Sequence, residues 1–186
     1  MKAPVVFINF HGFMGEADNK NSRALRALFK DATIISPQID YLKQSPKQIL
    51  KAGRQHIDAV MASGACPITV GQSLGGWVAE QLSREYSIPC LLTNPCLDPH
   101  LCTVIVDSPI KRDFLEEYKA LSAPAQNSKS FTLCTKSDEV LGEGNFDRCA
   151  LLGGWLKEVG GKHSSIENLE EELKRGADAA LKANCT

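Results

Sequence analysis

The sequence predicts a single domain of the α/β class, with helices covering both faces of a mostly parallel sheet. Short apolar runs alternate along the chain with longer segments of helical period, which is the pattern of repeated strand–helix–strand units. The chain has 186 residues, enough for one hydrophobic core but hardly for two. Its apolar fraction of 43% and charged fraction of 23% are ordinary for a globular protein. We therefore expect one three-layer domain with about six strands.

The first half of the chain contains the clearest elements. The run 4–10 is rich in Val and Phe and too short to cross a membrane, so it predicts a core strand. Segment 46–62 begins at the helix start signal Ser45-Pro46, and the amphipathic segment 74–86 directly follows the strand 67–71. Strands are expected over 4–10, 32–36, 67–71, 88–93, 130–135 and 154–159, and helices over 20–30, 46–62, 74–86, 110–121 and 164–183.

The second half of the chain is less regular. In the stretch 94–128 four prolines surround one short helix, so we expect a cap-like insertion, either a packed connection or a small cap over a site. The last helix, 164–183, begins with Ser164-x-x-Glu167, which is typical of a capping box. Ligands of open parallel sheets bind at the carboxyl ends of the strands, so the residues after each strand are the site candidates.

The charge and the cysteines argue against several classes of function. The 21 basic and 22 acidic residues leave a net charge of -1, which provides no general attraction to nucleic acid or anionic membrane. The seven cysteines are an odd number without a signal peptide, which favours free thiols in a reducing cytoplasm. The group Cys96, His100 and Cys102 lacks a CxxC pair and a fourth ligand, so it does not predict a metal site. We expect a mature, soluble, cytoplasmic protein with no metal, no organic cofactor and no evident protein partner.

A Gly-x-Ser-x-Gly motif lies between the third expected strand and the helix that follows it. In the segment Gly71-Gln72-Ser73-Leu74-Gly75-Gly76 the serine occupies the sharp turn known as a nucleophile elbow. Glycines two residues before and after it prevent collisions with neighbouring backbone, and the following helix directs its N–H groups toward developing negative charge. The alternative is a glycine-rich turn with an idle serine. The motif favours Ser73 as the nucleophile of a serine hydrolase.

A serine nucleophile needs a base, and the base needs an acid to orient it. On this type of fold the order along the chain is Ser, then Asp or Glu, then His. Only His100 and His163 follow Ser73, and His163 lies in the loop after the last expected strand. The alternative is a surface loop histidine, but position and order together favour His163 as the base.

The acid is expected after the penultimate strand, which is followed by Asp138 and Glu139. We assign Asp138 to this role, and Glu139 is its nearest rival. The alternative is that Asp138 is a solvated loop residue without a catalytic role. Asp98 and Asp107 are weaker candidates because they lie in the irregular insertion.

Two backbone N–H groups are candidates for an oxyanion hole. Leu74 directly follows the nucleophile, and Phe13 lies in the loop after the first strand, where Gly12 allows the backbone to approach a reacting carbonyl. We expect His11 to brace this loop by hydrogen bonding rather than to act as the base, because it precedes the nucleophile in the chain. The side chains of Phe13 and Met14 in this loop could line an acyl pocket, but they could equally belong to the hydrophobic core. Candidates for the substrate pocket are His11, Met14 and Gln72.

Several motifs together resemble those of the small YqiA-like esterases of the α/β-hydrolase superfamily. These motifs are His11-Gly12-Phe13, Gly71 to Gly76, Asn94-Pro95, Thr135 to Leu141 and Gly160-Gly161-Lys162-His163. They occur in the family's order and extend over nearly the whole chain. The serine elbow and the His-Gly pair are specific only to the superfamily, whereas the Asp-Glu-Val-Leu and Gly-Gly-x-His runs with Asn-Pro narrow the resemblance.

The resemblance implies an α/β-hydrolase fold that lacks the first two strands of larger hydrolases. Carried over residue by residue, it implies that Ser73, Asp138 and His163 match the family's catalytic triad. It also implies hydrolysis of small-molecule, short-chain acyl esters without metal or organic cofactor. The sequence departs from the family between Pro95 and Ser130, which shapes the substrate pockets, so substrate preference is not transferred.

The same motifs leave two further functions open. Thioesterases, amidases and acyltransferases use the same machinery, because the elbow does not encode the leaving group. A non-catalytic α/β-hydrolase relative could instead bind a ligand or a protein. The presence of a serine, an aspartate and a histidine in the required order favours an enzyme that acts on ester bonds.

Overall fold

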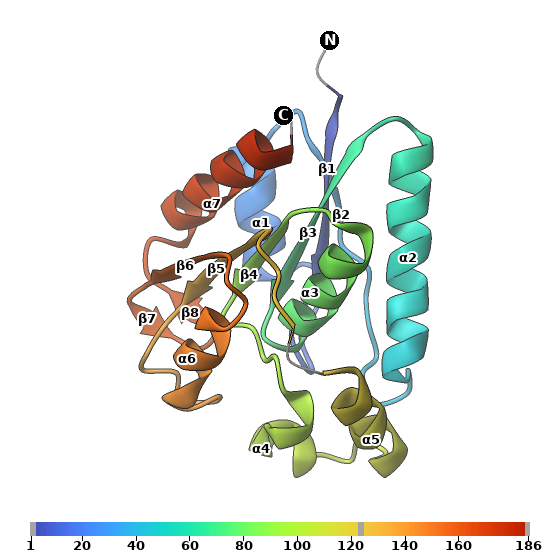
Figure 1. Ribbon diagram of the computed structural model, residues 1–186, viewed down its shortest axis with the longest axis vertical. Helices are drawn as coiled ribbons and strands as arrows, with labels where there is room; N and C mark the ends of the chain where they lie inside the picture. The colour runs from blue at the N-terminus through green and yellow to red at the C-terminus, as the bar shows by residue number, and fades with distance from the viewer. Residues whose placement is uncertain (1–2, 123–124, 185–186) are drawn as a thin grey trace.

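The computed structural model describes residues 3–122 and 125–184. Its centre is a six-stranded sheet in the order β2-β1-β3-β4-β5-β6, and every pair of neighbouring strands is parallel (Figure 1). This arrangement confirms the predicted α/β fold with a mostly parallel sheet. The strands are β1 (Val5–Phe10), β2 (Thr33–Ile35), β3 (Cys66–Gln72), β4 (Cys90–Thr93), β5 (Ser130–Cys134) and β6 (Trp155–Glu158).

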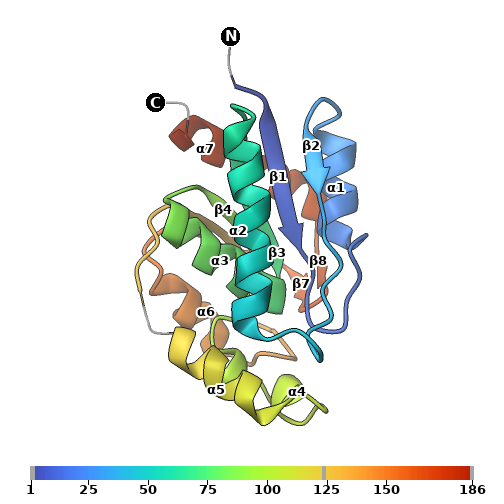
Figure 2. The same cartoon turned by 90° about the vertical axis from the view of Figure 1, so that its right-hand side faces the viewer.

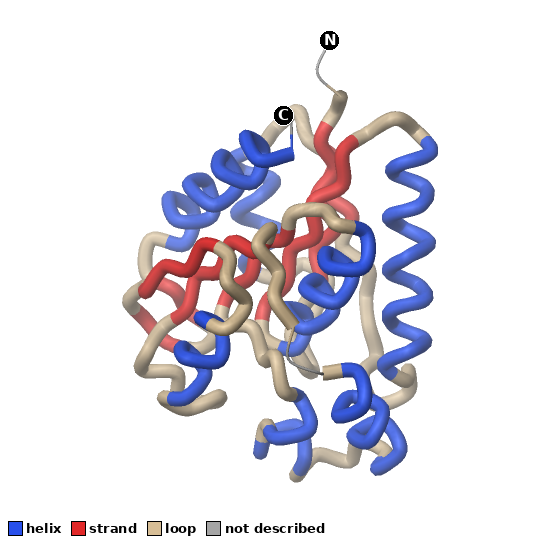
Figure 3. The backbone as a smooth tube through the Cα atoms, viewed as in Figure 1, coloured by secondary structure: helices blue, strands red, loops and turns tan. Residues whose placement is uncertain are grey.

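Helices cover both faces of this sheet, as Figures 1 and 2 show. Helices α1 and α7 contact each other on one face, whereas α2 and α3 contact each other on the opposite face. The remaining short helices lie near the carboxyl ends of the strands (Figure 3). The helices are α1 (Lys20–Leu28), α2 (Pro46–Ala62), α3 (Leu74–Tyr86), the 3-10 helix η1 (Pro99–Leu101), α4 (Thr103–Val106), α5 (Arg112–Leu121), α6 (Gly144–Ala150) and α7 (Leu169–Asn184).

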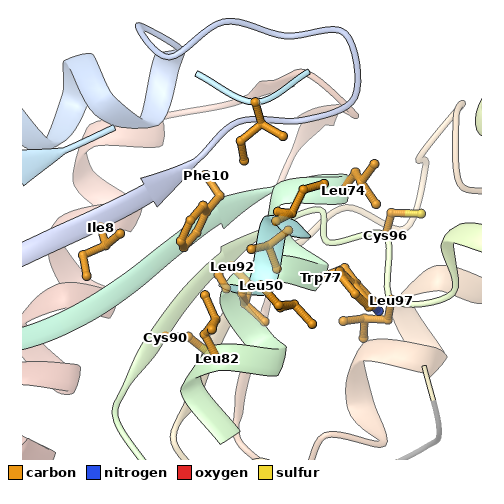
Figure 4. Close-up of a cluster of buried hydrophobic side chains, with 14 of the residues drawn as sticks. Ile8, Phe10, Leu50, Leu74, Trp77, Leu82, Cys90, Leu92, Cys96 and Leu97 are labelled. Atoms are coloured by element: carbon orange, nitrogen blue, oxygen red, sulfur yellow. The ribbon is translucent and has the colours of Figure 1, made fainter. Parts of the chain in front are cut away.

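The alternation of side chains along the first strand explains the two core layers. Phe7 packs with residues of α1 and α7, whereas Ile8 and Phe10 belong to the larger cluster under α2 and α3. All three side chains are buried because successive strand residues point to opposite faces and both faces are covered. The larger cluster also includes Trp77 and Leu97 (Figure 4).

Trp77 joins the insertion to the main body of the domain. Its ring packs edge-on against Tyr118 of α5, with ring centroids 4.8 Å apart, and its indole Nε1–H donates to Ser122 Oγ over 2.8 Å. A buried indole therefore has both its apolar body and its polar group satisfied. These contacts hold α5 against α3, close to the carboxyl end of β3.

Most predicted elements are present, with ends shifted by one or a few residues. The start signal at Ser45 forms a full capping box, in which Gln48 N–H donates to Ser45 Oγ and Ser45 N–H donates to Gln48 Oε1. Helix α5 corresponds to the helix expected within the insertion. Helices η1, α4 and α6 have no counterpart among the predicted elements, because each is at most seven residues long and lacks a repeated apolar stripe.

The predicted start of the last helix is wrong. The helix begins at Leu169 and not at 164, and Ser164-x-x-Glu167 is not a capping box. Instead, β7 (Gly161–Lys162) pairs antiparallel with β8 (Ser165–Ile166). The Glu167 N–H donates to the Gly160 carbonyl over 3.0 Å, so the backbone group that a helix would have used closes a hairpin. This pairing leaves His163 and Ser164 as the two turn residues.

No helix in the described part of the chain combines the length and the apolar character needed to cross a membrane.

Candidate active site

Three side chains from three separate loops meet at the carboxyl edge of the sheet. Ser73 follows β3, Asp138 follows β5, and His163 lies in the hairpin after β6. Ser73 Oγ lies 2.9 Å from His163 Nε2, and His163 Nδ1 lies 2.8 Å from Asp138 Oδ2. The structure thus brings together the three residues predicted as nucleophile, base and acid, and joins them in one line of hydrogen bonds.

The backbone at Ser73 has an uncommon conformation, with φ 53° and ψ -124°. A side chain on Gly71 would collide with the Gly75 backbone, and one on Gly75 would collide with the carbonyl of Phe10. The two glycines therefore allow β3 to turn directly into α3 while the chain packs against β1. A positive φ at a non-glycine residue is costly and is concentrated at functional sites, which is consistent with a sharp turn that exposes the serine hydroxyl.

Asp138 is buried and accepts hydrogen bonds at both carboxylate oxygens. Its Oδ1 accepts from the backbone N–H groups of Val140 (3.0 Å) and Leu141 (2.8 Å), while its Oδ2 faces His163. Burial on its own would raise the pKa of Asp138, but the hydrogen bonds from His163 and the two backbone groups outweigh it and hold the pKa below its ordinary value. The carboxylate is therefore ionised at neutral pH and fixed in orientation.

Glu139, the rival acid, contacts the same histidine in a different way. Its Oε2 accepts from the backbone N–H of His163 over 3.0 Å and does not reach the ring. This hydrogen bond lowers the pKa of Glu139. The ring of His163 is thus oriented by Asp138, while Glu139 holds the hairpin turn that carries it.

Asn94, which the sequence analysis named only within the family motif Asn94-Pro95, is a structural part of the site. Its Nδ2 donates to the His163 carbonyl over 2.9 Å, and its Oδ1 accepts from the Thr135 N–H over 2.8 Å. The side chain is 0% exposed, so a single amide joins the end of β4 to the acid loop and to the base hairpin. The sequence held one signal for this role, an asparagine at the carboxyl end of a buried strand. A buried amide side chain must find hydrogen-bond partners.

The predicted oxyanion donors belong to two segments that adjoin the nucleophile, the start of α3 and the loop after β1. Leu74 is the first residue of α3, where a backbone N–H has no partner within the helix. Gly12 lies against Ser73, because a methyl group placed on it would lie 3.1 Å from Ser73 Cβ and 3.7 Å from Ser73 Oγ. A side chain at position 12 would therefore crowd the nucleophile, and glycine leaves this space free.

The candidate pocket residues have three different environments. His11 is 0% exposed, and both of its ring nitrogens bond to backbone groups. Met14 is 75% exposed and has a φ of 54°, so it projects from the tip of the loop into solvent. Gln72 is half-buried and lines a small hollow together with His163.

A cavity of about 210 Å³ lies between the insertion and the acid loop. Its walls include residues that contact two of the three central residues: Cys96 N–H donates to the backbone carbonyl of Ser73 over 2.9 Å, and Val140 N–H donates to the Asp138 carboxylate. One side of the cavity is held by the ion pair between Arg148 and Asp98, with Nε and Oδ2 2.6 Å apart. The lining residues are Cys96, Leu97, Asp98, Leu101, Cys102, Thr103, Val140, Leu141, Gly144, Asn145 and Arg148.

The structure contains no candidate metal centre within residues 3–122 and 125–184, where no three His, Cys, Asp or Glu side chains are grouped to hold an ion. Cys96 and Cys102 are free thiols in this region. Hydrogen bonding from Cys96 lowers the pKa of Cys102 to about 6.

The fold is similar to those of several solved hydrolase structures. Est1E from Butyrivibrio proteoclasticus, solved with ferulic acid bound, has a TM-score of 0.74 at 13% identity over 97% of this chain and 89% of that chain. A putative hydrolase from Agrobacterium vitis S4 has a TM-score of 0.75 at 14% identity, over 100% and 91% of the two chains. A putative YdeN-like hydrolase from Pectobacterium atrosepticum SCRI1043 has a TM-score of 0.68 at 15% identity, over 96% and 92%. At these identities the likeness establishes the α/β-hydrolase fold.

Residues 6–174 match the family described as "Uncharacterised protein family (UPF0227)", and this match confirms the resemblance to the YqiA-like family. No curated protein sequence matches the chain.

Proposed function

The chain belongs to the UPF0227 family, and on that premise we propose that it is a serine hydrolase that cleaves short-chain acyl esters. The observation that carries the proposal is the hydrogen-bonded line from Ser73 Oγ through His163 to Asp138, with distances of 2.9 and 2.8 Å. A hydroxyl, a base within reach of its proton and an ionised acid that orients the base are the parts of an activated nucleophile. The similarity of the fold to structures described as putative hydrolases supports the same class of reaction.

In the proposed mechanism, Ser73 Oγ attacks the ester carbonyl carbon while His163 Nε2 accepts the hydroxyl proton. The oxygen of the tetrahedral intermediate is stabilised by the N–H groups of Phe13 and Leu74. His163 then gives the proton to the leaving alcohol, and the carbon–oxygen bond of the ester breaks. Water then attacks the acyl carbon while His163 Nε2 accepts a proton from it. The bond between that carbon and Ser73 Oγ breaks as His163 returns the proton to the serine oxygen, which releases the carboxylic acid. Asp138 remains ionised throughout and stabilises the protonated imidazole.

The cavity beside the acid loop supports a small acyl group as the substrate. An apolar cavity of about 150 Å³ holds one benzene molecule. The 210 Å³ cavity has room for an acyl chain of a few carbons or one ring, and its walls are mixed. The apolar Leu97, Val140 and Leu141 line it together with polar and charged residues that include the Arg148–Asp98 ion pair. Thioester and amide substrates present the same acyl group, so a comparison of the three leaving groups is part of the test.

The test is covalent labelling of the purified protein with a fluorophosphonate probe, with turnover of p-nitrophenyl acetate and butyrate measured in parallel. Wild type should be labelled and active, and Ser73→Ala should lose labelling and several orders of magnitude of activity. Ser128→Ala is a matched control, because this exposed serine precedes β5 at the opposite edge of the sheet. Absence of labelling in folded wild type would contradict the proposal and favour a ligand-binding protein.

We further propose a reducing compartment such as the cytoplasm for this enzyme. The support is that six described cysteines, including the half-buried Cys66, are free thiols.

A further inference from the structure

The cavity beside the acid loop has one wall that is built from an ion pair. Arg148 lies on α6, and Asp98 directly precedes η1 in the insertion. Arg148 Nε lies 2.6 Å from Asp98 Oδ2, and Arg148 Nη2 lies 3.3 Å from Asp98 Oδ1, so the guanidinium donates to both carboxylate oxygens. A two-point contact of this kind fixes the orientation of both side chains. Among the described residues, it is the one hydrogen-bonded link between α6 and the insertion.

Both charged side chains are in a position to meet an acyl group. They are 18% and 26% exposed, and both line the cavity together with apolar residues such as Leu97 and Leu141. An alkyl chain that reached the ion pair would remove water from two charges and offer them no hydrogen bond in return, which opposes its binding. The apolar part of the cavity therefore suits a short alkyl chain, and the ion pair disfavours a longer one.

The ion pair also leaves no free cation in the cavity. Arg148 is the only lysine or arginine in the described lining, and its charge is already paired with Asp98. The Cys102 thiol, whose pKa is lowered to about 6, lines the same cavity and repels anions when it is ionised. An acyl group that ends in a carboxylate would therefore find no partner for its charge.

We propose that Asp98 and Arg148 determine which acyl group the cavity accepts, by excluding long alkyl chains and by leaving no cation for a carboxylate. The inference rests on the proposed serine hydrolase function, and it narrows the substrates to esters of short, uncharged acids. Neither side chain belongs to the hydrogen-bonded line from Ser73 to Asp138. Replacement of the pair is therefore expected to change the preference for the acyl group and not the chemistry.

Apolar replacement of both charges tests the exclusion of long chains. In Asp98→Leu with Arg148→Met no charge is left unpaired, and the wall offers apolar contact instead. Each methylene that becomes buried should raise kcat/KM about fourfold. We expect the ratio of kcat/KM for p-nitrophenyl octanoate to that for butyrate to rise about tenfold, while turnover of the acetate stays close to wild type. A wild type that already prefers octanoate to butyrate would overturn the proposal.

Removal of one charge tests the absence of a free cation. Asp98→Asn keeps the size of the side chain but leaves Arg148 without its carboxylate partner. Mono-p-nitrophenyl adipate and p-nitrophenyl hexanoate have acyl groups with the same number of carbons, and only the adipate ends in a carboxylate that can pair with the guanidinium. We expect the ratio of kcat/KM for adipate to that for hexanoate to rise about tenfold in Asp98→Asn and not in the apolar double variant.

A second ion pair of the molecule provides the matched control. Lys157 of β6 and Glu172 of α7 are also partly buried, but neither lines the cavity. Lys157→Met with Glu172→Leu should therefore alter neither ratio.

The outcomes separate this inference from the proposed function. If the Asp98–Arg148 pair were merely structural, its loss would lower the free energy of unfolding and the turnover of every ester by a similar factor. That result, or an unchanged ratio in either folded cavity variant, would overturn the proposal. Asp98→Asn alone decides if the double variant does not fold. A folded wild type that turns over no ester would instead overturn the proposed function.

Discussion

The two sides of the cavity near Ser73 and Asp138 are built in different ways. On the acid–base side, buried Asn94 connects the hairpin of His163 to the loop of Asp138 through hydrogen bonds. On the insertion side, η1 and α4 are only three and four residues long, and Leu101 and Val104 are 71% and 53% exposed. The side chains of the proposed base and acid are thus held by buried hydrogen bonds. The insertion, in contrast, leaves apolar side chains exposed to solvent. On the proposed function, this difference predicts that substitutions on the insertion side change substrate preference and leave the hydrogen bonds of Ser73, His163 and Asp138 intact.

The largest effect should come from the most constrained group. Asp138→Asn places an amide donor or acceptor where only an acceptor holds the histidine correctly, so the ring can adopt the wrong tautomer. We expect kcat for p-nitrophenyl butyrate to fall about 10,000-fold with an unchanged circular dichroism spectrum. Glu139→Gln is the matched control and should lose far less, since Glu139 bonds only to the backbone of His163. Full activity in Asp138→Asn together with loss in Glu139→Gln would transfer the role of the acid to Glu139.

An intermediate effect should follow from removal of the amide that joins the two loops. Asn94→Ala leaves the buried Thr135 N–H and the His163 carbonyl without their partner, which costs about 1–3 kcal/mol for each unsatisfied group. We expect the free energy of unfolding in urea to fall by about 2–4 kcal/mol and kcat to fall about tenfold, because the base hairpin loses its support. Unchanged stability and unchanged kcat would show that the hairpin and the acid loop do not depend on Asn94.

The smallest effect should follow from a substitution on the insertion side of the cavity. Leu101→Ser removes an exposed side chain that lines both the cavity and the groove between α4 and α5. Stability should change by no more than about 0.5 kcal/mol, because the side chain is mostly in solvent. We expect kcat/KM for p-nitrophenyl hexanoate to fall about threefold relative to acetate, since a longer chain loses roughly one methylene of apolar contact. An equal loss of kcat/KM for p-nitrophenyl acetate would show that Leu101 affects catalysis in general and not the fit of longer acyl chains.

The parts of the molecule that sequence predicted correctly are those that depend on local pattern. The placement of Ser73 after β3, Asp138 after β5 and His163 after β6 needed only the alternation of elements and the direction of a parallel sheet. The turn at Ser73 was predictable because its glycines are required within five residues of one another.

The missed features depend on contacts between distant segments. Ser164 and Glu167 satisfy the local rule for a helix start, yet the Glu167 N–H bonds to Gly160 and the helix begins later. Helix α6 buries only Asn145 and Cys149 and so has no apolar stripe to detect. Asn94 acts through partners 41 and 69 residues away, which no local pattern encodes.

The distance along the chain between nucleophile and base has a consequence for biosynthesis. Ser73 and His163 are 90 residues apart, and His163 lies beyond the edge strand β6. A ribosome adds residues from the N-terminus at about 5–20 per second, so the serine turn leaves the ribosome several seconds before its base. On the proposed function, the nascent chain therefore has an unactivated Ser73 hydroxyl until the hairpin that carries His163 has been synthesised and has folded.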